Sequence, residues 1–185
     1  MLVVRAFEQL GIPYLIGGSI TSTLHGEPRS TLDADFAAHL ERGDVEPLVA
    51  RLEPDFFVDA TGVREASECK IHFNVIHRKV FVKVDVHVRP RSGHFAEEIR
   101  RARDVRLSDE GTARIATPAD TLLRKLWSYR LGDGASDRQW RDALGILRAI
   151  GPTLDRDYLV RWSADLEVAD LVRRAWLEAG LGQGP

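Results

Sequence analysis

Cysteine is nearly absent from this chain of 185 residues, and an excess of charge of either sign is absent too. The single cysteine, Cys69, excludes an intramolecular disulfide and a zinc ribbon built on several thiolates, and it fits a reducing cytoplasm. The formal net charge of -2 argues against a protein whose affinity rests on coating nucleic-acid phosphates with lysine and arginine. We therefore expect a cytoplasmic protein that has no DNA partner.

Long apolar runs and several catalytic motifs are missing as well. No apolar run is long enough to cross a membrane, and the N-terminal run is too short, with Glu8 too early, for a signal peptide, so we expect no membrane partner. No Gly-x-Ser-x-Gly elbow and no Walker lysine occur, which excludes serine hydrolases and P-loop proteins. The six histidines are scattered without the spacing of zinc ligands.

The stretch from Tyr14 to His39 holds the features that point to chemistry. An apolar strand over 14–16 is followed by a glycine turn, a short helix ending near Gly26, and a second strand that carries Asp33 and Asp35. Strand side chains alternate between faces, so both carboxylates project from the same face. Carboxylates this close need a cation, and their hard oxygens suit Mg²⁺.

The turn before these acids consists of Gly17, Gly18 and Ser19. Without Cβ atoms, the glycine backbone can approach an anion closely, and the next helix offers free N–H groups at its N-terminus. We predict that a phosphate site and a metal site lie side by side here.

A third acid, Asp85, stands in the alternating run over 80–88, where valines form one face. An aspartate in mid-strand is poor strand material, which favours a function for it. Two interpretations stay open at this point: a functional carboxylate, or a solvent-facing aspartate paired with Lys83 or His87.

The composition becomes helical at Thr117, a good N-cap followed by proline. We predict an α/β domain with a mixed sheet over residues 1–116 and a helical domain over residues 117–185, with helices near 121–131, 137–150, 155–166 and 168–181. The four tryptophans of this second part are expected in its core.

The spacing of the glycine turn and the two acids resembles the nucleotidyltransferase superfamily with the polymerase-beta-like fold. The residues that carry the resemblance are Ile16, Gly17, Gly18, Ser19, Asp33 and Asp35. It implies an α/β nucleotidyltransferase fold with a C-terminal helical domain, a nucleoside triphosphate as substrate, and Mg²⁺, with Mn²⁺ as a substitute. It also implies that Asp33, Asp35 and Asp85 are metal ligands and catalytic residues.

A more specific resemblance is to the abortive-infection (AbiE-like) nucleotidyltransferase toxins, through Arg29, Thr31, Lys125 and Asp142. It implies that the nucleotide-binding residues are Gly17, Gly18, Ser19, Arg29, Thr31 and Lys125. It implies that Lys125 and Asp142 complete the catalytic set. The sequence departs from that family's pattern directly after Asp142, where Ala143, Leu144 and Gly145 follow.

These resemblances imply transfer of a nucleoside monophosphate to an acceptor hydroxyl, at a transfer-RNA 3′ end or on a protein, in a toxin–antitoxin system with a cognate antitoxin as partner. Two alternatives stay open. The first is an inactive nucleotidyltransferase-fold module that binds a nucleotide or a partner. The second is an enzyme that modifies small molecules of the antibiotic type.

Overall fold

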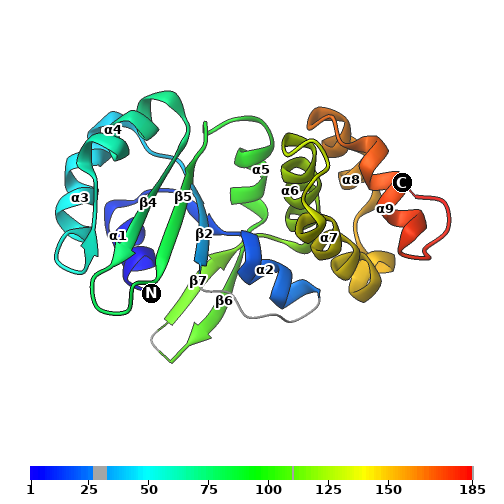
Figure 1. The fold of residues 1–185 in the computed structure, drawn as a ribbon, viewed down its shortest axis with the longest axis horizontal. Coiled ribbons are helices and arrows are strands. Elements are labelled where there is room, and N and C mark those ends of the chain that lie inside the picture. Colours follow the sequence, from blue (N-terminus) through cyan, green and yellow to red (C-terminus); the bar gives the residue numbers. More distant parts are fainter. Residues whose placement is uncertain (27–32, 110, 185) are drawn as a thin grey trace. The chain divides into compact units, whose positions relative to one another are not determined.

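The computed structural model describes residues 1–26, 33–109 and 111–184. The chain divides into two compact units (Figure 1). The first unit comprises Met1–Ser19 and Thr31–Ala116, and the second comprises Ile20–Ser30 and Thr117–Pro185. Each unit has its own layers and its own core.

The first unit is built on a mixed sheet, which confirms the predicted fold class. Within the described residues seven strands form one sheet, in the order β3-β4-β5-β2-β1-β7-β6. The pairs β2–β5 and β1–β7 are parallel, and the other pairs are antiparallel. The strands are β1 (Tyr14–Ile16), β2 (Asp33–Ala38), β3 (Phe56–Phe57), β4 (His72–His77), β5 (Lys83–Val88), β6 (Arg103–Ser108) and β7 (Gly111–Ile115).

One face of this sheet packs on α1 (Leu2–Leu10) through three aromatic rings. Phe7 of the helix lies 5.5 Å from the Tyr14 ring and 5.8 Å from the Phe36 ring, measured between centroids. Helices α3 (Val45–Leu52) and α4 (Ala60–Cys69) also belong to this unit, and a 3₁₀ turn, η1 (Arg42–Asp44), leads into α3. Figure 1 shows α1, α3 and α4 together on one side of the strands.

The opposite face of the sheet is covered in part by α5 (Gly93–Arg101). Phe95 of α5 forms a small buried cluster with Leu15 of β1 and with Ala116, and Ala37 of β2 packs against this cluster. Because side chains alternate along β2, the face of Ala37 is also the face of Asp33 and Asp35. The helix therefore covers the Ala37 end of that face.

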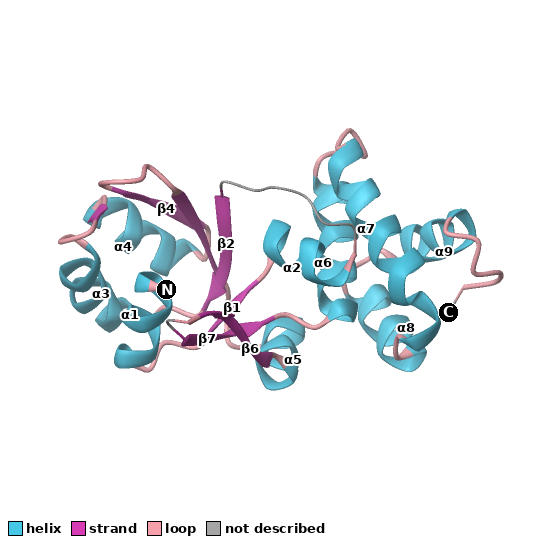
Figure 2. Ribbon diagram, turned by 90° about the horizontal axis from the view of Figure 1, so that it is seen from below, coloured by secondary structure: helices cyan, strands magenta, loops and turns pink. Residues whose placement is uncertain are grey.

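The second unit is helical, as its composition predicted. Its helices are α6 (Pro118–Leu131), α7 (Asp137–Ile150), α8 (Arg156–Asp165) and α9 (Ala169–Glu178), with the 3₁₀ turn η2 (Gly151–Thr153) (Figure 2). They share one apolar core that includes Trp140, Trp162 and Trp176, with Trp127 packed against it. Most of α2 (Gly18–His25) is counted with this unit, although its first two residues belong to the first.

The ten-residue helix α4 is capped at its N-terminus by the Asp59 carboxylate, which accepts from the Thr61 N–H. One local expectation was wrong. The strand expected from Val80 begins only at Lys83, because Phe81 has a positive φ of 54° and belongs to the turn. No helix in the part of the chain described has the length and apolar character needed to span a bilayer.

Candidate active site

Three carboxylates share one face of the sheet because β2 and β5 are parallel neighbours. In their register Asp35 lies directly opposite Asp85, and Asp33 lies opposite Lys83. Asp33 and Asp35 are two residues apart on β2, so all three acids point to the same side. Asp33 is exposed, and Asp35 and Asp85 are half-buried. The buried valines at 84, 86 and 88 face the other way.

The glycine turn lies directly against the second of these acids. The Gly17 N–H donates to the backbone oxygen of Asp35 at 2.9 Å, and the Ser19 N–H donates to its Oδ2 at 3.3 Å. Gly18 has a φ of +60°, and a Cβ built on it would stand 1.9 Å from Asp35 Oδ2. Only glycine fits this position, because its lack of a Cβ permits both the left-handed backbone and the close approach.

Helix α2 begins at this turn, and its first two residues, Gly18 and Ser19, lie against Asp35. A helix N-terminus carries a partial positive charge and N–H groups without intrahelical partners. In this structure the Asp35 carboxylate accepts from one of them. The same groups suit a phosphate, so the turn and the carboxylates form one polar site with both donors and acceptors.

Lys83 is a member of this face that the sequence-based site did not include. Its Nζ lies 2.7 Å from Asp85 Oδ2, which is the pairing that one of the two open interpretations of Asp85 named. The hydrogen bond to Asp85 raises the pKa of the Lys83 ammonium, and the charges of Asp85, Asp33 and Asp35 add to this shift. The signal in the sequence was the i, i+2 spacing, which places Lys83 and Asp85 on one face of a strand.

The polar surface continues onto β4, beyond the acids. Asn74 lies opposite Asp85 and His72 opposite His87, and the two imidazole rings are 5.8 Å apart. Burial lowers the pKa of His87, and the nearby Arg89 charge lowers it further. His72 and Asn74 are exposed. Sequence reasoning missed Asn74 because its position next to Asp85 depends on the pairing of β4 with β5.

In the second unit, the two predicted site residues contact each other. Lys125 Nζ of α6 donates to Asp142 Oδ2 of α7 at 2.7 Å, and both side chains are buried, with 6% and 9% of their surface exposed. A buried ion pair of this kind needs good geometry to offset the cost of removing two charges from water. The structure thus places these two residues in one contact within the helical unit.

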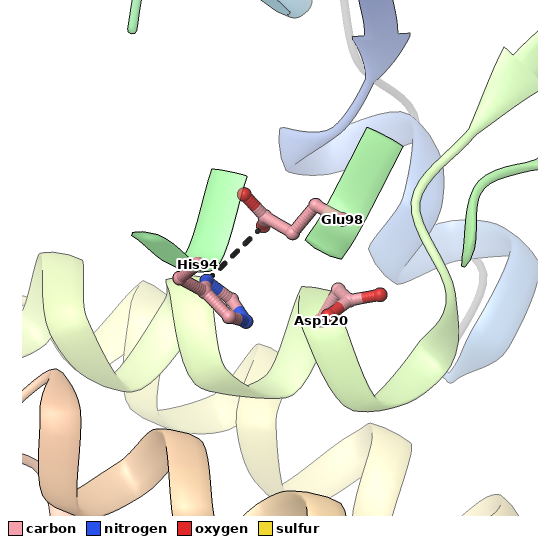
Figure 3. A group of neighbouring side chains, drawn as sticks. All are labelled: His94, Glu98 and Asp120. Carbon is pink, nitrogen blue, oxygen red and sulfur yellow. Dashed lines mark ion pairs between the residues drawn. The ribbon is translucent and has the colours of Figure 1, made fainter. Parts of the chain in front are cut away.

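Two further buried acids belong to structural networks. His94 and Glu98 lie one turn apart on α5, with Nδ1 and Oε1 3.7 Å apart, as the dashed line in Figure 3 shows. Asp120, also labelled in Figure 3, belongs to the second unit, where it accepts hydrogen bonds from the Thr117 hydroxyl at 2.5 Å and from the Tyr158 hydroxyl. Asp120 is fully buried, so these donors satisfy its carboxylate inside the helical unit.

Arg29 and Thr31, predicted to bind the nucleotide, lie outside the described residues. The other predicted residues fall into two groups. The first unit holds Gly17, Gly18, Ser19, Asp33, Asp35 and Asp85, and the second holds Lys125 and Asp142.

Comparison with known proteins identifies the fold. One similar solved structure is that of an antigenic nucleotidyltransferase-like protein from Paracoccidioides brasiliensis, with a TM-score of 0.57, 20% sequence identity, and coverage of 96% of this chain and 89% of that chain. Another is the solution structure of the antibiotic-resistance factor ANT(2'')-Ia, with a TM-score of 0.50, 16% identity, and coverage of 96% and 92%. No protein-family model and no curated protein sequence matches this chain. The chain therefore has the nucleotidyltransferase fold, shown by structure and not by sequence.

Proposed function

We propose that this protein is a nucleotidyltransferase that moves a nucleoside monophosphate from a nucleoside triphosphate to an acceptor hydroxyl, with release of pyrophosphate. The observation that carries the proposal is the cross-strand pair of Asp35 and Asp85, with Asp33 on the same face. The glycine turn against Asp35 and a fold shared with a nucleotidyltransferase-like protein support it.

The donor set of this face fits a divalent cation. Carboxylate oxygens are the ligands that Mg²⁺ and Mn²⁺ prefer, and three carboxylates share this face, with the Lys83 ammonium beside Asp85. Asp33 and Asp35 would hold the ion, with Asp85 next to them. When bound, the ion withdraws charge from the phosphate oxygens of the substrate.

The residues of the chain would share the remaining work as follows. Backbone N–H groups at Gly18 and Ser19, and the Ser19 hydroxyl, would bind the phosphates. Asp85 would accept the proton of the acceptor hydroxyl while the acceptor oxygen bonds to the α-phosphorus. The bond from the α-phosphorus to the bridging oxygen would break, and pyrophosphate would leave with that electron pair.

We further propose that residues 1–116 form the catalytic domain and residues 117–185 a helical domain. Arg29, Thr31 and Lys125 are proposed to bind the triphosphate, and Asp142 is proposed to complete the catalytic set. The buried contact of Lys125 with Asp142 supports a role for these two residues as a pair. Each of these roles can be tested by substitution.

The acceptor that we favour is an RNA 3′ end, such as that of transfer RNA, or a protein hydroxyl, with the enzyme as the toxin of a toxin–antitoxin pair and a cognate antitoxin as its partner. A small-molecule acceptor is the alternative that the likeness to an antibiotic-resistance factor favours. An inactive binding module is the alternative in which no transfer occurs.

The experiment uses nucleoside triphosphates labelled with ³²P at the α-phosphate, each incubated with the protein, Mg²⁺ and a cell extract. We expect label to move from the triphosphate to RNA or protein, and the product class identifies the acceptor. Label in a small solute would indicate the antibiotic-type alternative. No transfer from any triphosphate, together with retained nucleotide binding, would indicate the binding module.

Matched variants connect this activity to the site. Asp33→Asn removes an exposed carboxylate without a change of size, and we expect it to abolish both metal-dependent nucleotide binding and transfer. Asp85→Asn should keep much of the nucleotide binding and lose transfer by about a hundredfold, the usual scale for a positioned base. Transfer at the wild-type rate by Asp85→Asn would show that Asp85 is not the base.

A further inference from the structure

Lys83 places a positive charge inside the acidic face. It stands two residues before Asp85 on β5 and directly opposite Asp33 on β2. Its ammonium lies 2.7 Å from Asp85 Oδ2, a contact between a side chain that is 42% exposed and one that is 16% exposed. A divalent ion at Asp85 would compete with this ammonium for the same carboxylate.

The ammonium is held there by its contact with Asp85. Its position opposite Asp33 also keeps it on the face that Asp33 and Asp35 share. Lysine is fully protonated at neutral pH already at its ordinary pKa of about 10.4, so this group is a permanent cation of the site. It acts as the counter-ion that the third carboxylate requires.

A count of charges leads to the same conclusion. The three ionised carboxylates carry three negative charges, which one divalent ion and the one ammonium of Lys83 neutralise. A second divalent ion in the nucleotide-free site would leave two excess positive charges on one small face. Because like charges repel each other at short range, the ammonium opposes entry of that second ion.

We propose that Lys83 takes the place of a second divalent ion at Asp85, so that the nucleotide-free protein binds one divalent cation, at Asp33 and Asp35. A second ion enters only after the ammonium has left Asp85. This inference rests on the proposed function, because it takes Asp33 and Asp35 as metal ligands. It goes further by making Lys83 a positioning residue that holds the proposed base and sets the number of ions in the site.

The test is a Mn²⁺ titration of the nucleotide-free protein, which is monitored by calorimetry and by electron paramagnetic resonance. We expect the wild type to bind a single ion with an uncoupled Mn²⁺ spectrum. Lys83→Met should bind a second ion at least about tenfold more tightly than the wild type does, because the competing ammonium is gone. Two ions on neighbouring carboxylates should give a broadened, spin-coupled spectrum.

Two control variants isolate the position of the charge. Lys79→Met removes one positive charge from the exposed turn before β5, and it should bind Mn²⁺ as the wild type does. Lys83→Arg keeps the charge at the site and should also bind one ion. Circular dichroism of each variant before the titration establishes that the variant is folded.

The outcomes separate this inference from the proposed function. If Asp33→Asn loses the Mn²⁺ site while Lys83→Met gains nothing over Lys79→Met, the role of Lys83 is wrong and the metal site stands. A wild type that binds two ions with a coupled spectrum also overturns the role of Lys83. If Asp33→Asn binds Mn²⁺ as well as the wild type, or if no protein binds it, the proposed metal site and the inference both fail.

Discussion

The substitution Gly18→Ala tests the close approach of the glycine turn to the acidic face. The new methyl carbon would stand 1.9 Å from Oδ2, 2.4 Å from Cγ and 2.5 Å from Cβ of Asp35. Non-bonded atoms cannot approach each other this closely, so the Asp35 side chain has to leave its position. The backbone of Gly18, with a φ of +60°, is also strained for alanine.

The expected cost has three sources. The left-handed backbone costs an alanine about 1–2 kcal/mol, and a side chain forced off its rotamer costs about 0.5–1.5 kcal/mol. Loss of the hydrogen bond from the Ser19 N–H to Asp35 adds about 1 kcal/mol. We therefore expect Gly18→Ala to lower the free energy of unfolding by about 3 kcal/mol.

Two other glycines of the same unit provide matched controls. Gly11 has a φ of +67° with nothing within 4 Å of an added Cβ, so Gly11→Ala should show the backbone cost alone. At Gly17 an added Cβ would meet only Leu15 Cδ1, at 3.9 Å, so Gly17→Ala should change stability little. Urea unfolding ranks the three variants by their free energy of unfolding. The midpoints can be compared if the slope of the free energy against urea concentration is the same for all three.

The same three proteins connect stability to function through Mn²⁺ affinity. Only Gly18→Ala displaces a proposed metal ligand, Asp35. We therefore expect only this variant to lose affinity for Mn²⁺, by about tenfold. A Gly18→Ala protein as stable as Gly17→Ala, with unchanged Mn²⁺ affinity, would refute the reasoning about this turn.

Three further predictions concern buried polar groups. Lys125→Met should destabilise the protein by about 3 kcal/mol, since it removes the ammonium that the buried Asp142 carboxylate contacts, and the double variant with Asp142→Leu should recover part of this in urea unfolding. Tyr158→Phe should cost about 1–3 kcal/mol by the same assay, because it removes a hydroxyl that donates to the fully buried Asp120. Burial raises the pKa of Tyr14, so the folded protein keeps a proton that the unfolded chain loses above about pH 10. Stability should therefore fall as pH rises from about 9 to about 11, and Tyr14→Phe should fall less.

Periodicity in the sequence predicted most helices and the side to which strand residues point. The sequence over 137–150 predicted a helix, and α7 spans the same residues. Alternation along β2 was enough to place Asp33 and Asp35 on one face. Both are local properties of the chain, which is why a single sequence contains them.

Pairing between distant strands could not be predicted from the sequence. That Asp35 lies opposite Asp85, and that Asn74 lies on the other side of Asp85, follows from the order of β2, β5 and β4 in the sheet. Strand order depends on contacts over long sequence separations, which no local pattern records. For this reason Asn74 was missed and Lys83 was only one of two suggested partners of Asp85.

Local caps and turns matter where the apolar pattern is weak. Helix α4 has few apolar residues and a glycine in its first turn, and the Asp59 cap helps to stabilise it. The run from Val80 has the alternation of a strand, yet Phe81 adopts a left-handed backbone in the turn and the strand starts at Lys83. Hydrogen bonds of a cap and the closure of a hairpin compete with propensity at such positions.

The central claim is that the face bearing Asp33, Asp35 and Asp85 carries out nucleotidyl transfer. Its most direct test is the release of inorganic pyrophosphate from nucleoside triphosphates in the presence of Mg²⁺ and a cell extract, measured for the wild type and for Asp33→Asn. We predict that the wild type releases pyrophosphate and that Asp33→Asn releases none above background. Equal pyrophosphate release by both proteins would contradict the claim.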